Sequence, residues 1–190
     1  KDTWGSIDMG GASTQVTFIP HDVSIIQNFF PLHLSYLSIH LYAHSFLEFG
    51  YNDANMRLVR LLLQEGRPGT EERPLDHPCY PAGRSFVQPL REPFFIDRAS
   101  IWIRGTGDLQ RCMGLALSLL DLNKPCFVPA RSHNFERNSS FAGACSIAGT
   151  YEPELYSQKF IAMGQYAKIA KVMGLPLECP VPLREFLRGT

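Results

Sequence analysis

The chain has 190 residues and no net charge, with 18 basic and 18 acidic side chains and 45% hydrophobic residues. This composition argues against a disordered chain and against a nucleic-acid-binding protein, and the length suits one hydrophobic core or one lobe of a larger enzyme. The sequence contains no apolar run of about 18 or more residues, so no segment is predicted to span a membrane. The chain begins at Lys1 almost inside a predicted strand and without a signal peptide, which we interpret as an excised part of a longer protein.

The first predicted element is an N-terminal hairpin. Its first strand ends at Asp8, Gly10 and Gly11 form a tight turn, and the return strand places Val16 and Phe18 on one side. Glycine permits positive φ and lets the backbone approach a ligand closely. Successive N–H groups in such a turn form a concave anion-binding site.

The side chains beside this turn suit a phosphate that carries a divalent cation. Ser13, Thr14 and Gln15 add hydroxyl and amide donors, and Asp8 is placed to hold a cation directly or through water. An ordinary hairpin is the simpler explanation of an isolated Gly-Gly pair. The complete octet from Asp8 to Gln15 favours the ligand site.

The rest of the chain mixes strands and helices. Asp53 to Gln64 has apolar residues at helical spacing and is predicted to be a well-buried helix. Asp108 is placed to cap a second helix that runs to Leu120 and follows a strand at Ile101 to Ile103. The other expected segments are strand and loop at 21–31, an exposed loop at 65–73, loops and short strands at 74–95, and a helix from Tyr156 to Met173.

The octet Asp8-Met9-Gly10-Gly11-Ala12-Ser13-Thr14-Gln15 resembles the fourth apyrase signature of the ectonucleoside triphosphate diphosphohydrolase family. The resemblance continues in the same order through later segments, and it covers most of the chain. These segments are Leu41–Leu47, Asp76–Tyr80, Gly105–Asp108 with Cys112, Cys145–Tyr151 and a diverged Phe160–Ala162. The resemblance implies an α/β fold, as an actin-like (ribonuclease-H-like) lobe with a mixed sheet flanked by helices. Residues 1–190 would form one of two lobes, with an insertion at 127–144 and the other lobe missing.

The resemblance also implies a reaction: hydrolysis of nucleoside tri- or diphosphates with Ca²⁺ or Mg²⁺, by in-line attack of water without a covalent intermediate. The N–H groups of Gly10 to Ala12 and the hydroxyl of Ser13 would bind phosphate oxygens. Asp8 would hold the hydrated cation and Gln15 would orient the attacking water. The general base is expected on sequence that precedes Lys1, so this chain alone is expected to be inactive while the full-length parent is an enzyme.

The nucleobase contacts depart from the family pattern. Tyr51 stands near the position where some members carry a base-contacting arginine, and Tyr166 lies where a base-stacking aromatic is expected. These two tyrosines are the candidates for base contact. The expected partner is a nucleotide and not a nucleic acid, and membrane anchoring of the parent is left open.

Five cysteines without a Cys-x-x-Cys pair do not indicate a zinc site, and their spread suits disulfides. The resemblance implies the pairs Cys79–Cys112 and Cys126–Cys145 and leaves Cys179 over. The alternative is free thiols in a cytosolic protein.

Asn138 is an N-glycosylation acceptor. With the disulfides, it favours the secretory pathway, with the parent outside the cell, at its surface, or in the ER or Golgi lumen.

Two other hypotheses compete with the nucleotidase. The first is a catalytically inactive phosphate- or partner-binding module of the same fold, which a substitution at Asp8 or Gln15 would have favoured. The second is another actin-like phosphatase, such as an exopolyphosphate hydrolase, which shares the glycine turn. The order of the cysteines and the segment from Cys145 to Ala162 count against it.

His40, His44 and Ser45 are the remaining candidates for chemistry. The two histidines have the i, i+4 spacing of a helical zinc pair, but Leu41 stands where a metalloprotease needs glutamate and no third ligand is evident. As neighbours on an expected helix, His44 and Ser45 would point in different directions. We interpret all three as structural.

Overall fold

The computed structural model describes residues 3–20, 28–66, 69–95, 99–126, 145–153, 155, 159–166 and 168. Contacts divide the chain into two compact units. The terminal unit comprises Lys1–Tyr51 with Leu122–Thr190, and the central unit comprises Asn52–Asp121. Within the described residues, no helix has the length and apolarity needed to cross a membrane.

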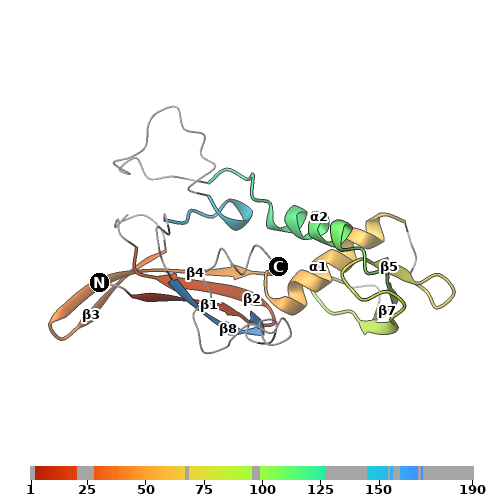
Figure 1. Ribbon diagram of the computed structural model, residues 1–190, viewed down its shortest axis with the longest axis horizontal. Helices are drawn as coiled ribbons and strands as arrows, with labels where there is room; N and C mark the ends of the chain where they lie inside the picture. The colour runs from red at the N-terminus through yellow and green to blue at the C-terminus, as the bar shows by residue number, and fades with distance from the viewer. Residues whose placement is uncertain are drawn as a thin grey trace. The chain divides into compact units, whose positions relative to one another are not determined.

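The terminal unit is built on a five-stranded sheet with the strand order β3-β4-β2-β1-β8 (Figure 1). β1 and β8 are parallel, whereas the other neighbouring strands are antiparallel. The sheet is therefore mixed, as expected. Its strands are β1 (Trp4–Met9), β2 (Ser13–Phe18), β3 (Phe29–Leu34), β4 (Leu37–Leu47) and β8 (Lys159–Gly164), and a short 3-10 helix, η2, spans Ile147–Gly149.

One face of this sheet is buried because apolar residues alternate along its strands. Val16 and Phe18 lie on this face, which confirms the predicted alternation. Phe18 packs against Tyr42 with ring centroids 5.0 Å apart and edge-on against Phe160 at 5.8 Å. The buried cluster consists of Ile7, Val16, Phe18, Tyr42, Phe46 and Phe160. These contacts fix the hairpin of β1 and β2 to the rest of the sheet.

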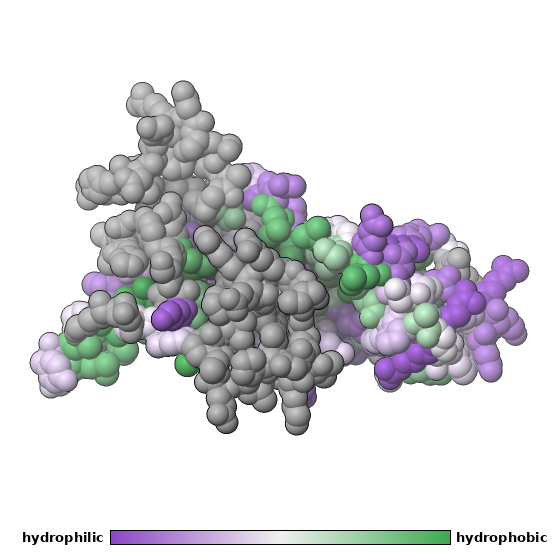
Figure 2. All heavy atoms as spheres, in the orientation of Figure 1, coloured by the Kyte–Doolittle hydropathy of each residue, from purple (hydrophilic) through white to green (hydrophobic). Residues whose placement is uncertain are grey.

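The β3–β4 hairpin has an apolar face of its own. Phe30 pairs with Leu41 and Leu32 pairs with Ile39, and alternation places these four side chains on one side. Phe30 and Leu32 are exposed, and Figure 2 shows hydrophobic atoms over this end of the sheet. The site described below lies at the other end of β4.

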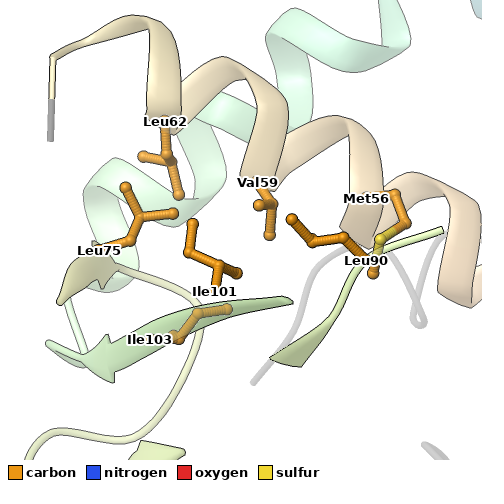
Figure 3. Close-up of a cluster of buried hydrophobic side chains, with 7 residues drawn as sticks. All are labelled: Met56, Val59, Leu62, Leu75, Leu90, Ile101 and Ile103. Carbon is orange, nitrogen blue, oxygen red and sulfur yellow. The ribbon is translucent and has the colours of Figure 1, made fainter. Parts of the chain in front are cut away.

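The central unit packs α1 (Tyr51–Gln64) on a three-stranded sheet with the order β5-β7-β6. Its other elements are β5 (Leu75–His77), β6 (Ser85–Pro89), β7 (Ser100–Gly105) and α2 (Leu109–Leu120). Met56, Val59 and Leu62 recur every three residues on one face of α1, so they point together at the sheet. They meet Leu75, Leu90, Ile101 and Ile103 in one buried cluster (Figure 3). Burial of each such side chain stabilises the fold by roughly 1.5–3 kcal/mol.

The predicted boundaries of the two helices are close to the observed ones. α1 begins at Tyr51, two residues before the expected start at Asp53. The Asp108 carboxylate accepts a hydrogen bond from the Arg111 N–H at 3.0 Å, so Asp108 caps α2 as predicted. Capping is a local interaction, and local sequence therefore locates it well.

Two helix assignments are wrong. His40, His44 and Ser45 lie on β4, and Lys159 to Gly164 form β8 rather than part of a helix from Tyr156. β8 pairs with β1 along its whole length, and that long-range pairing outweighs the helical propensity of the segment. Asn138, Cys179, the expected insertion at 127–144 and most of residues 21–31 lie outside the described residues.

Candidate functional site

Asp8 and Gln15 face each other across the hairpin of β1 and β2. They are paired in the antiparallel register, next to the pair formed by Met9 and Thr14. The Gly10 N–H donates to the Ser13 carbonyl at 2.9 Å and closes the turn. β1 ends at Met9, one residue beyond the expected end at Asp8.

Asp8, Ser13 and Gln15 share the face of the sheet opposite the buried cluster. Paired residues of an antiparallel ladder point to the same side, and so do residues two apart on a strand. The Gln15 side-chain amide donates to the Ser13 hydroxyl. All three residues are partly exposed, so the structure brings these three predicted site residues together at an accessible surface.

Thr14 does not belong to this group. Its side chain lies on the opposite face and is 5% exposed, and its hydroxyl donates to the Phe49 carbonyl at 2.7 Å. A hydroxyl has one donor hydrogen, and that of Thr14 is already used. The expectation that Thr14 adds a donor beside the turn is therefore wrong.

The segment Phe49 to Tyr51 forms hydrogen bonds with backbone carbonyls of the turn. The Gly50 N–H donates to the Ala12 carbonyl at 3.1 Å, and the Tyr51 N–H donates to the Gly10 carbonyl at 3.0 Å. In a trans peptide the carbonyl and the following N–H point in opposite directions. The N–H groups of Gly11 and Ser13 therefore point away from this segment, which is the arrangement that an anion-binding turn requires.

The glycines of the turn do not use positive φ. The described glycines with positive φ do not include Gly10 or Gly11. Gly50 is instead required by close approach, because a Cβ at this position would lie 2.4 Å from the Ser13 nitrogen and 2.5 Å from the Ala12 carbonyl carbon. Sequence reasoning missed this role of Gly50. The available signal was a glycine three residues before the start of the helix predicted at Asp53.

The two tyrosines proposed for base contact have different surroundings. Tyr51 is the first residue of α1 and is 52% exposed, and its backbone bonds to the turn. Tyr166 is partly buried against the core cluster of the terminal unit, and burial raises the pKa of its hydroxyl. The structure thus places Tyr51 beside the turn and Tyr166 against the core.

Among the described residues, the histidines of β4 belong to no group that could hold a metal ion. His44 lies on the inner side of the sheet, edge-on to Phe46 with ring centroids 4.5 Å apart, and burial lowers its pKa. Ser45 follows it on the strand and points to the opposite face. His40 is four residues from His44, roughly 13 Å along an extended strand, which is too far to share one zinc ion. All three residues lie on a strand rather than a helix, and the register pairs the exposed Ser45 with Gln15.

A group of polar side chains surrounds Tyr42, which lies in the middle of β4. The Tyr42 hydroxyl donates to the Tyr151 carbonyl at 2.8 Å. Burial raises the pKa of the adjacent Glu152 carboxyl, and a hydrogen bond with Ser146 opposes this shift. The register places Tyr42 beside Phe18, three residues along β2 from Gln15, and on the opposite face of the sheet. This cluster is therefore separate from the turn.

The donor atoms at the turn fit a hard divalent cation. Ca²⁺ and Mg²⁺ prefer oxygen ligands, and Mg²⁺ is often held by one carboxylate together with water and substrate phosphates. Asp8 supplies such a carboxylate beside the hydroxyl of Ser13 and the side-chain amide of Gln15. Among the described residues, no group of three or more His, Cys, Asp or Glu could hold a metal ion by itself. A cation at Asp8 would therefore depend on water and on a bound phosphate.

Both disulfides implied by the resemblance are present. Cys79 is bonded to Cys112 with Cα atoms 5.0 Å apart, and Cys126 to Cys145 with Cα atoms 5.5 Å apart. Disulfides of this kind fit an oxidising compartment.

A family model described as GDA1/CD39 (nucleoside phosphatase) matches residues 1–172 of the chain. Mouse ectonucleoside triphosphate diphosphohydrolase 3 is 29% identical over 192 residues, covering 92% of this chain and 32% of that protein. Mouse ectonucleoside triphosphate diphosphohydrolase 8 is 32% identical over 160 residues, covering 81% of this chain and 30% of that protein. Arabidopsis thaliana probable apyrase 5 is 28% identical over 182 residues, covering 91% of this chain and 34% of that protein. The chain thus spans about a third of the length of these relatives.

The structure also resembles that of nucleoside triphosphate hydrolases from Neospora caninum. The TM-score is 0.52 at 18% identity, and the match covers 91% of this chain and 39% of the other. At this identity the likeness shows the fold alone. It confirms the expected actin-like fold class, with mixed sheets and helices.

Proposed function

Because the chain belongs to the GDA1/CD39 (nucleoside phosphatase) family, we propose that the full-length protein hydrolyses the terminal phosphate of nucleoside tri- or diphosphates. The reaction uses Ca²⁺ or Mg²⁺ and proceeds by in-line attack of water. The observation that carries the proposal is the grouping of Asp8, Ser13 and Gln15 on one face of the sheet. This group lies beside a turn whose Gly10 and Ala12 carbonyls accept hydrogen bonds from Tyr51 and Gly50.

Each group at the turn has a role that follows from its chemistry. The N–H groups of Gly11 and Ser13, with the Ser13 hydroxyl, bind oxygens of the transferred phosphate, where negative charge is stabilised by donors already in place. The Gly10 N–H already donates to the Ser13 carbonyl, so the expected phosphate contact of this N–H is replaced by a role of the Gly10 carbonyl, which sets the direction of the Gly11 N–H. The Ala12 N–H keeps its expected role as a donor to phosphate, and the Ala12 carbonyl sets the direction of the Ser13 N–H. Tyr51 is the better placed of the two candidates for base contact.

Asp8 and Gln15 act on the cation and on water. When bound, the cation neutralises charge on the phosphate oxygens and orients them. The Asp8 carboxylate holds the hydrated cation through water. Gln15 lies opposite Asp8, roughly 5 Å away between Cβ atoms in such a pair, so its amide can orient a water molecule beside the same phosphate.

The chain supplies one part of the catalytic apparatus. The chain spans about a third of the length of its relatives, and none of the roles assigned above is that of a general base. We place the base in the other lobe of the full-length protein, together with further phosphate contacts. The two disulfides support a location in the secretory pathway or outside the cell.

Phosphate release by the full-length protein tests the proposal. Release from ATP, ADP, GDP and UDP should require Ca²⁺ or Mg²⁺ and stop with EDTA. Ser13→Ala and Gln15→Ala should each lower kcat by about 10²-fold or more, because each removes a group that acts on the transition state.

Ser6→Ala is the matched control. Ser6 lies on the same face of β1, paired with Thr17 and away from the turn, so its loss should leave kcat within about twofold. Absence of release from the wild type, or release that is indifferent to both site substitutions, would contradict the proposal. Nucleotide binding without release would favour the inactive binding module.

A further inference from the structure

The end of β8 lies against the side chain of Asp8. β8 runs parallel to β1, with Asp8 in register with Met163 and Met9 in register with Gly164. Gly164 has a φ of +66°, a backbone conformation that favours glycine. This pairing brings a residue from the far end of the sequence to the candidate cation ligand.

A side chain at position 164 has no room beside Asp8. A Cβ built on Gly164 would lie 2.3 Å from Oδ1 of Asp8 and 2.4 Å from the Met9 carbonyl oxygen. Both distances are shorter than any non-bonded contact that real Cβ atoms make. The Asp8 carboxylate therefore occupies space that exists only because residue 164 is glycine.

We propose that Gly164 is a positioning residue for the Asp8 carboxylate. The inference rests on the cation-holding role of Asp8 in the proposed function. The Met9 carbonyl belongs to the backbone of a paired strand and moves little, whereas the Asp8 side chain can rotate. A methyl group at position 164 would thus turn the carboxylate out of its place, and displacement of a ligand by about 1 Å is enough to impair a positioned site.

Two other effects of the same substitution need a control. Alanine at position 164 would also adopt an unfavourable positive φ and press on the Met9 carbonyl. Gly83 provides the match, because its φ is +78° and nothing lies within 4 Å of a Cβ built there. Gly83→Ala imposes the backbone strain without the contact.

The experiment uses the full-length protein with five forms: wild type, Gly164→Ala, Gly83→Ala, Asp8→Ala, and the double variant of residues 8 and 164. Ca²⁺ binding is measured calorimetrically in the presence of a non-hydrolysable ATP analogue, together with the Ca²⁺ concentration that gives half-maximal phosphate release. We expect Gly164→Ala to weaken Ca²⁺ binding at least 10-fold and to raise the half-maximal concentration in parallel. Gly83→Ala should change neither by more than about twofold.

The double variant separates an effect through Asp8 from a general loss of structure. Once Asp8 is alanine, Gly164→Ala should weaken the remaining Ca²⁺ binding no further, because interacting residues give non-additive changes. Thermal unfolding gives a second readout, which is informative even if the Gly164→Ala variant does not fold. If Gly164→Ala lowers the melting temperature or prevents folding, Asp8→Ala should restore part of the loss by removing the nearer contact.

Three results bear on the inference in different ways. Unchanged Ca²⁺ binding in Gly164→Ala would overturn it, and so would an equal loss of binding or stability in the presence and absence of Asp8. Ca²⁺ binding by Asp8→Ala that equals binding by the wild type would overturn the proposed role of Asp8 itself. In that case the melting temperatures of the single and double variants still decide whether residues 8 and 164 interact.

Discussion

His77 illustrates how one buried side chain can make the stability of the protein depend on pH. It is 1% exposed in the central unit, with its ring 4.6 Å from that of Tyr80. Its Nδ1 accepts a hydrogen bond from the Cys79 N–H at 3.3 Å, and its Nε2 has no partner among the described residues. Burial disfavours the charged imidazolium and lowers the pKa of His77 to about 4.

The stability should therefore fall on acidification. An unfolded histidine takes up a proton below a pH of about 6.5, whereas the folded one stays neutral down to about 4. The full stabilisation is present above about 6.5, and up to about 3 kcal/mol is lost as the pH falls through this window. Urea unfolding at several pH values measures this slope.

His77→Asn keeps an acceptor for the Cys79 N–H and removes the titrating group, so the variant should lose less stability between about pH 6.5 and 4 than the wild type. His33→Asn is the control, because His33 is exposed on β3. A slope that is identical in His77→Asn and the wild type would refute this source of pH dependence.

At the scale of elements, the segment between β4 and α1 connects the candidate site to a helix. Phe49, Gly50 and Tyr51 each bond to the hairpin, and Tyr51 is also the first residue of α1. The first N–H groups of a helix have no partner within it, and here the Gly10 carbonyl satisfies one of them. The turn and Tyr51, both in the terminal unit, therefore hold each other in place.

Gly50→Ala should disturb this arrangement. A methyl group at this position would meet backbone atoms of Ala12 and Ser13, which cannot rotate away as a side chain can. We expect kcat for phosphate release by the full-length protein to fall by about 10²-fold, because displacement of positioned donors by about 1 Å has this effect. Steady-state kinetics of phosphate release measures it.

Gly114→Ala is the matched control. Gly114 lies within α2 and nothing is within 4 Å of a Cβ built on it, so the substitution should preserve activity and stabilise the helix by up to about 1 kcal/mol. Full activity in Gly50→Ala would show that the turn does not depend on this segment.

At the scale of the whole molecule, each compact unit has its own core and its own disulfide. Cys79–Cys112 lies within the central unit and Cys126–Cys145 within the terminal unit. A disulfide stabilises mainly by restricting the unfolded chain, and the sequence separation of 33 residues between Cys79 and Cys112 corresponds to about 3–4 kcal/mol.

Removal of one disulfide should thus weaken one unit. Replacing Cys79 and Cys112 by serine should speed hydrogen exchange on α1 and β7 by about 10²-fold or more and leave β1 and β2 largely protected. Replacement of Cys126 and Cys145 serves as the reciprocal control. Loss of protection across both units in either variant would show that they unfold together.

Features that depend on near neighbours could be predicted from the amino-acid order alone. The alternation of Val16 and Phe18 defined the return strand, apolar spacing defined α1, and the Asp108 carboxylate defined the start of α2. The octet from Asp8 to Gln15 identified the turn, and both disulfide pairs followed from the family resemblance. These signals are local, or are kept in fixed order along the chain, so no three-dimensional information was needed.

The residues that meet across long separations could be identified only in the folded chain. The Thr14 hydroxyl is taken by a carbonyl 35 residues away, which no pattern around the octet reveals. Residues 159–164 form a strand because β1 pairs with them, and the same pairing places Gly164 against Asp8. Sequence periodicity reports which side of an element is apolar, but the partner of that side is fixed by packing and by hydrogen bonds between distant segments.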